Sequence, residues 1–97
     1  MGKKYVKSII FDDAEEVCYL CGKYGNTEVH HIFGGSVRQT SDKYGLIVHL
    51  CPTCHGKLHG KYGDNSKQML HMIGQQAYEE QIGNREKFIE EFIRSYL

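Results

Sequence analysis

Short segments rich in apolar residues occur in the first half of the chain, between polar and glycine-containing stretches. Segments 27–33 and 45–50 are rich in β-branched and aromatic residues and are bounded by glycines or polar residues. This composition with these boundaries is typical of strands. We therefore predict two strands separated by a polar loop over 34–43. We also expect a strand or extended segment over 5–11 and a short helical turn over 14–17.

In the second half of the chain, apolar residues recur with a helical period. Pro52 suits the first turn of a helix and predicts a short one that runs to about residue 59. A second helix is predicted over 66–81, with Asp64 or Asn65 as its N-cap. A last helix follows the cap residue Asn84 and places its large apolar residues on one face: Phe88, Ile89, Phe92, Ile93, Tyr96 and Leu97.

These elements predict an α+β fold in a single domain of 97 residues. Strand, loop, strand and helix would form a core over about 26–60, followed by a helical part over about 64–97. A chain of this length buries only about 60–65% of its unfolded surface, so a bound metal is a common source of added stability. The apolar face of the last helix either covers the sheet or forms a homodimer surface.

Net charge and hydropathy limit the classes of function that this chain could have. The 12 basic and 12 acidic residues cancel, which argues against nucleic-acid binding through overall charge. A bound divalent metal could still supply the local positive charge that such binding needs. No apolar run is long enough for a membrane span, and no signal-peptide core follows Met1. We therefore expect a cytoplasmic protein with no membrane partner.

The cysteines occur as two pairs with the same spacing. Cys18 and Cys21 form one pair, and Cys51 and Cys54 form the other. Two such turns can surround one Zn²⁺ ion tetrahedrally with no sulfur left over. Two disulfides are the alternative in an oxidising compartment, but they do not explain why the spacing occurs twice. The sequence therefore predicts a structural zinc site.

Histidines supply a second set of metal ligands. His55 and His59 are four residues apart on a predicted helix, so their imidazoles share one face. His30 or His31 from the first strand would complete a three-histidine site that stays open to water and substrate. The other imidazole of that pair would be free to act as a general base. The remaining histidines are interpreted as structural: His49 and His71.

Together these residues resemble the HNH nucleases of the ββα-metal class. The upstream cysteine pair matches the zinc-knuckle variants of that family, and a broader likeness to small HNH-like proteins of phages and prophages extends over about 8–97. The resemblance implies a small ββα-metal core with a four-cysteine zinc knuckle and two C-terminal helices. It is carried by His30-His31-Ile32 and by Leu50-Cys51-x2-Cys54-His55-x3-His59.

The resemblance also implies a function, the hydrolysis of phosphodiester bonds in double-stranded or nicked DNA by a phage or prophage endonuclease. His31 would be the general base. His30, His55 and His59 would hold a divalent cation such as Mg²⁺, Mn²⁺, Ni²⁺ or Zn²⁺ at the scissile phosphate, where it stabilises the leaving 3′ oxygen. Three basic residues are either contacts to neighbouring phosphates or solvated surface charges: Arg38, Lys43 and Lys57.

One position departs from the HNH pattern. The second strand of the family carries an Asn that orients the base, whereas this chain has Leu46. Because a Leu side chain cannot form hydrogen bonds, either another group holds His31 or catalysis is weakened. Asn26 and His49 are candidates for that group. The alternative function is a non-catalytic zinc-binding module that docks on nucleic acid or protein, and the extra histidines disfavour a redox or metal-sensing protein.

Overall fold

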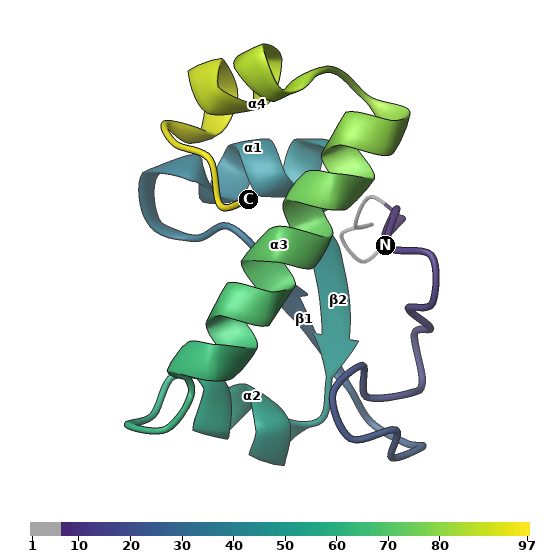
Figure 1. Ribbon diagram of the computed structural model, residues 1–97. Helices are drawn as coiled ribbons and strands as arrows, with labels where there is room; N and C mark the ends of the chain where they lie inside the picture. The colour runs from purple at the N-terminus through teal and green to yellow at the C-terminus, as the bar shows by residue number, and fades with distance from the viewer. Residues whose placement is uncertain (1–6) are drawn as a thin grey trace.

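The computed structural model describes residues 7–97, and over these residues it confirms the predicted α+β class. Helix α3 crosses the two-stranded sheet, with α1 and α4 towards one end and α2 at the other (Figure 1). None of the helices over 7–97 is both long and apolar enough to cross a membrane. The elements in chain order are β1 (Glu28–His31), the 3₁₀ helix η1 (Gly35–Val37), α1 (Arg38–Lys43), β2 (Ile47–Leu50), α2 (Pro52–Leu58), α3 (Asp64–Gln81) and α4 (Arg85–Phe92).

Both predicted strands form, although each is shorter than predicted. They pair antiparallel, with Glu28 opposite Leu50 and His31 opposite Ile47. Successive side chains of a strand project to opposite faces. His30 accordingly contacts α2, whereas His31 contacts α1. The two adjacent histidines of β1 therefore contact different helices.

The segment predicted to be a polar loop is instead helical, because it contains η1 and α1. No apolar stripe marks α1 in the sequence, since its buried residue is a serine, Ser41. The Ser41 hydroxyl accepts a hydrogen bond from the Phe33 backbone N–H (3.2 Å) and donates one to the Leu46 carbonyl (2.7 Å). A buried polar side chain thus joins the two ends of the segment that links the strands.

The N-terminal segment differs from its prediction as well. The strand or extended segment predicted over 5–11 lies partly outside the described residues, and residues 7–11 form no strand. The helical turn predicted over 14–17 is wrong, because isolated antiparallel bridges form there. The Asp13 carboxylate instead binds His49 of β2, accepting hydrogen bonds from its backbone N–H (2.8 Å) and its ring Nδ1 (2.6 Å). This pair ties the segment to the sheet.

Aromatic side chains form the centre of the core. The ring centroid of Phe33 lies 4.7 Å from that of Phe92 and 5.4 Å from that of Phe88, and all three residues are buried. The apolar face of α4 therefore completes the core of this chain. The homodimer surface stays a prediction. The large apolar residues that α4 and the following segment leave exposed are Ile89, Ile93 and Leu97.

Two helix boundaries differ from the sequence pattern, and one cap agrees with it. The Asn84 side chain accepts a hydrogen bond from the Lys87 N–H (2.9 Å), which confirms that cap. Helix α3 begins at Asp64 behind Gly63, so capping by Asp64 or Asn65 is wrong. Helix α4 ends at Phe92 although its apolar pattern continues. The chain turns back there, and the Tyr96 N–H donates to the Gln75 Oε1 (2.6 Å) of α3.

Close packing at Gly74 gives a test of how α3 meets the sheet. A Cβ at this position would lie 2.9 Å from side-chain atoms of both Ile32 and Phe33, which follow β1. We expect Gly74→Ala to destabilise the fold by about 1–3 kcal/mol through overpacking, even though Ala favours helices over Gly by about 1 kcal/mol. In Gly56→Ala, on exposed α2 surface, the added Cβ meets nothing within 4 Å, so this control should be neutral or stabilising. Urea unfolding measures the change in the free energy of unfolding for both variants. Equal stability of the two variants would contradict the close packing at Gly74.

Candidate metal centres and active site

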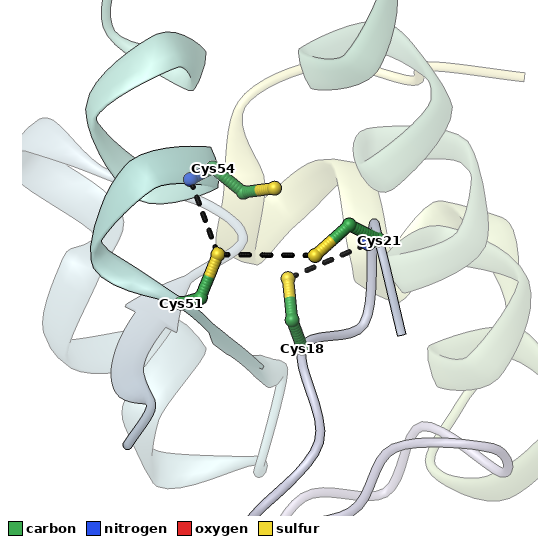
Figure 2. Close-up of side chains that lie close together, drawn as sticks. All are labelled: Cys18, Cys21, Cys51 and Cys54. Carbon is green, nitrogen blue, oxygen red and sulfur yellow. Dashed lines mark hydrogen bonds between the residues drawn. The ribbon is translucent and has the colours of Figure 1, made fainter. Parts of the chain in front are cut away.

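Four cysteines meet between the N-terminal segment and the start of α2. Figure 2 shows the side chains of Cys18, Cys21, Cys51 and Cys54 directed towards a common centre. Their sulfur atoms lie within 4.8 Å of one another, and those of Cys21 and Cys51 are 3.9 Å apart. All four are free thiols, so the alternative of two disulfides is not adopted. These residues lie close enough together to hold one metal ion.

Tight turns position each pair of sulfurs. The Cys21 N–H points to the sulfur of Cys18 at 3.5 Å, and the Cys54 N–H points to that of Cys51 at 3.4 Å. Gly22 closes the first turn with a φ of 78°, a conformation that side-chain-bearing residues rarely adopt. The second turn is the N-terminus of α2, where Cys51 is the N-cap. Backbone N–H groups directed at sulfur favour the thiolate over the thiol.

The thiols do not ionise equally. Burial raises the pKa of Cys18, but hydrogen bonds with backbone groups of Cys51, Cys21 and Leu20 lower it more, to about 6. Burial and hydrogen bonding with the other thiols raise the pKa of Cys54 to about 12. One thiolate therefore forms readily, whereas further negative charges repel one another. A divalent cation removes that repulsion, so this donor set suits an ion such as Zn²⁺.

Three histidines form a second cluster. One ring nitrogen each from His30, His55 and His59 lies within 4.8 Å of the others, so this set could also hold a metal ion. The ring centroid of His30 is 5.2 Å from that of His55 and 5.9 Å from that of His59. Strand β1 supplies His30, α2 supplies His55, and His59 is the C-cap of α2. Of the two adjacent histidines, the structure brings His30 to the helical pair.

The electrostatics of this cluster favour neutral ligands. Burial, followed by the charges of His55 and His59, lowers the pKa of His30 to about 4. Its imidazole is therefore unprotonated near neutral pH and keeps a lone pair for a cation. His59 is exposed and His55 is half-buried, so water and small ions can reach the cluster. The cysteine site also has one exposed member, Cys21, but two of its four cysteines are buried.

His31 lies beside the cluster and is held by α1. Its Nε2 is 3.1 Å from Asp42 Oδ1, and its Nδ1 is 3.4 Å from the Nε of Arg38. A carboxylate can only accept, so Nε2 carries the proton and Nδ1 keeps the lone pair. Asp42 thus supplies the hydrogen bond that Leu46, fully buried in the core, cannot supply.

Sequence reasoning missed Asp42. It proposed Asn26 or His49 for this role, but Asn26 is exposed and His49 is paired with Asp13. A signal was present, because Asp42 is the single acidic residue between the two strands. The helical turn of α1, which was not predicted, is what brings its carboxylate back to β1.

The cluster and His31 line one cavity of about 440 Å³. Its lining also includes Arg38, Lys67 and His71, and none of the described residues that line it is acidic. Such a cavity attracts anions, and a phosphate group is one of suitable size and charge. Lys67 belongs to α3, outside the Cys and His motifs, and nothing in its spacing marks it in the sequence.

The three basic residues proposed as phosphate contacts lie in different places. Arg38 lines the cavity beside His31. Lys57 lines a second cavity, near Lys61 and Tyr62. The ammonium group of Lys43 lies 5.1 Å from the centroid of the Tyr44 ring. The structure therefore brings Arg38, but neither lysine, into the lining of the histidine cavity.

The histidines interpreted as structural also differ from each other. His49 forms the pair with the Asp13 carboxylate, which is 2% exposed, and so joins two segments. His71 stacks on Phe33 with ring centroids 5.3 Å apart and an interplanar angle of 10°. Burial lowers the pKa of His71. His71 nevertheless lines the histidine cavity, a position that the sequence did not indicate.

No family model, curated protein or solved structure matches this chain. The resemblance to HNH nucleases therefore rests on the spacing of the Cys and His residues in the sequence.

Two variants separate the roles of the two clusters. We expect Cys51→Ser to lose the metal of the cysteine site and to lower Tm sharply, because structural metal binding contributes directly to the folding free energy. The matched variant His59→Ala removes a ligand from the other cluster and should keep both the tightly held metal and the Tm. Metal analysis after dialysis and thermal unfolding followed by circular dichroism check both outcomes. An unchanged Tm in Cys51→Ser would contradict a structural site.

Proposed function

We propose that this protein is a metal-dependent endonuclease of the HNH type that hydrolyses phosphodiester bonds in DNA. One observation carries the proposal: His31, oriented by Asp42 and not part of the three-histidine cluster, lines the same cavity as that cluster. Among the described residues that line this cavity, some are basic and none is acidic. A zinc-binding docking module would need the four cysteines alone. That alternative leaves the second cluster and the His31–Asp42 pair without a role.

The two clusters take different parts in this proposal. A Zn²⁺ ion at the cysteines would join the N-terminal segment to α2 and leave no position open for substrate. His30, His55 and His59 would hold a second divalent cation, which supplies Lewis-acid stabilisation at the scissile phosphate and the leaving 3′ oxygen. Arg38 and Lys67, in the lining of the same cavity, bind phosphate oxygens of the DNA strand.

His31 is the general base of this scheme. With its proton fixed on Nε2 by Asp42, Nδ1 accepts a proton from the attacking water. The Arg38 guanidinium now lies 3.4 Å from Nδ1. Hydrogen bonds between charged partners are stronger than hydrogen bonds to a neutral ring. A bound phosphate therefore draws Arg38 from the imidazole and leaves Nδ1 open to water.

Nicking of supercoiled plasmid by the purified protein tests the function. We expect cleavage with Mg²⁺, Mn²⁺ or Ni²⁺ that EDTA abolishes, and a loss of about 10²–10⁴-fold in His31→Ala, the usual contribution of a general base. Metal content and Tm of the variant should match the parent protein. Equal nicking by parent and variant would contradict the assignment of His31. No cleavage by either protein with both metals bound would favour the docking module.

Two substitutions of Asp42 test how His31 is oriented. Asp42→Ala removes the acceptor for Nε2–H and should lower kcat about 10-fold or more, since a hydrogen bond to a charged group contributes about 1.5–3 kcal/mol. KM should change little, because Asp42 does not line the cavity. Asp42→Asn keeps an acceptor oxygen and should recover most of the activity. A rise in KM alone, or equal damage by Asn and Ala, would contradict the positioning role.

A further inference from the structure

A carboxylate outside the cavity contacts one histidine of the cluster. Glu28 Oε1 lies 2.8 Å from Nδ1 of His55. Glu28 begins β1 two residues before His30, so both side chains project to the face of the strand that meets α2. The carboxylate accepts, so Nδ1 carries the proton, and Nε2 is the nitrogen of His55 that keeps a lone pair.

We propose that Glu28 is a positioning residue for the histidine metal site. It fixes the tautomer and ring orientation of His55 so that Nε2 is the ligand, and its negative charge makes that nitrogen a stronger donor. Carboxylate–histidine–metal chains of this kind raise metal affinity in many sites. The inference rests on the cation-binding part of the proposed function, and it holds whether or not the bound cation cleaves DNA.

The charges around the histidine cluster explain why the Glu28 carboxylate matters for cation binding. Three neutral imidazoles bring no negative charge to a divalent cation, and the charged side chains among the described residues of the cavity lining, Arg38 and Lys67, are basic. Glu28 does not line the cavity, so its charge reaches the cation through His55 without occupying a coordination position. The cation thus keeps its open positions for water or an anionic ligand.

The pair contributes little to folding, which makes the role testable. The Glu28 side chain is 53% exposed and that of His55 is 23% exposed. Side-chain pairs this accessible to solvent have little effect on stability. The less accessible Asp13–His49 pair, by contrast, joins two segments of the fold. Loss of the Glu28 carboxylate should therefore change metal binding while leaving the Tm nearly unchanged.

Calorimetric titration with Co²⁺ tests the proposal on protein whose cysteine site already holds Zn²⁺. We expect Glu28→Ala to raise the Kd for Co²⁺ by about 10–100-fold, the usual effect of removing such a partner. Glu28→Gln keeps an acceptor oxygen and should lose less. Glu90→Ala removes the same charge from the exposed surface of α4 and should bind like the parent protein.

Nitrogen-15 NMR of the histidine rings in the Zn²⁺-loaded protein gives the second readout. We expect His55 to be metal-bound through Nε2 and protonated at Nδ1. An unchanged Co²⁺ affinity in Glu28→Ala, or a metal-bound Nδ1 in the parent protein, would overturn the positioning role while leaving the cation site in place. Failure of the parent protein to bind Co²⁺ at the histidines would instead overturn both this inference and the cation-binding part of the proposed function.

Discussion

The convergence of four cysteine sulfurs at the start of α2 is the constraint on which the rest of the structure depends. The sheet has two strands of four residues each, and two-stranded sheets are marginal by themselves. A metal bound by both cysteine pairs would join the N-terminal segment to the junction of β2 and α2. Because Cys54 and His55 are neighbours on α2, the same constraint fixes the direction in which the histidine ligands project.

The helix α2 thus connects two sites with different chemistry. Its N-terminus contributes to a thiolate site with partly buried ligands, and its C-terminal turn presents His55 and His59 to an accessible cavity. The aromatic core formed by Phe33, Phe88 and Phe92 extends to α3 through Tyr78, whose ring centroid lies 5.2 Å from that of Phe88. Helix α3 in turn supplies Lys67 to the cavity lining. The positive character of the cavity is therefore a product of packing between elements, since the chain as a whole is neutral.

Carboxylates set the chemistry of three histidines, each in a different way. The Asp13 carboxylate has little contact with solvent and holds His49 as part of the fold. Asp42 lies on α1 and fixes the proton of His31 on Nε2. Glu28 lies on β1 and engages Nδ1 of His55. A histidine has two nitrogens with opposite roles in its neutral form, so the partner of one nitrogen decides what the other can do. The structural role of His49 and the proposed roles of His31 as base and His55 as ligand differ because of these partners.

The sequence by itself determined the features that depend on spacing within one turn or one strand. The repeated Cys spacing, the separation of His55 from His59, the alternation of His30 and His31, and the cap at Asn84 all follow from local backbone geometry. Only the tertiary structure decided the partners that these residues meet. Asp42 contacts His31 from α1, a helix without an apolar stripe, and Glu28 of β1 contacts His55 of α2. Helix α4 ends at Phe92, and the Tyr96 N–H that follows it donates a hydrogen bond to α3. Such contacts depend on strand register and on how the helices pack. Neither can be read from the spacing of residues that lie far apart in the sequence.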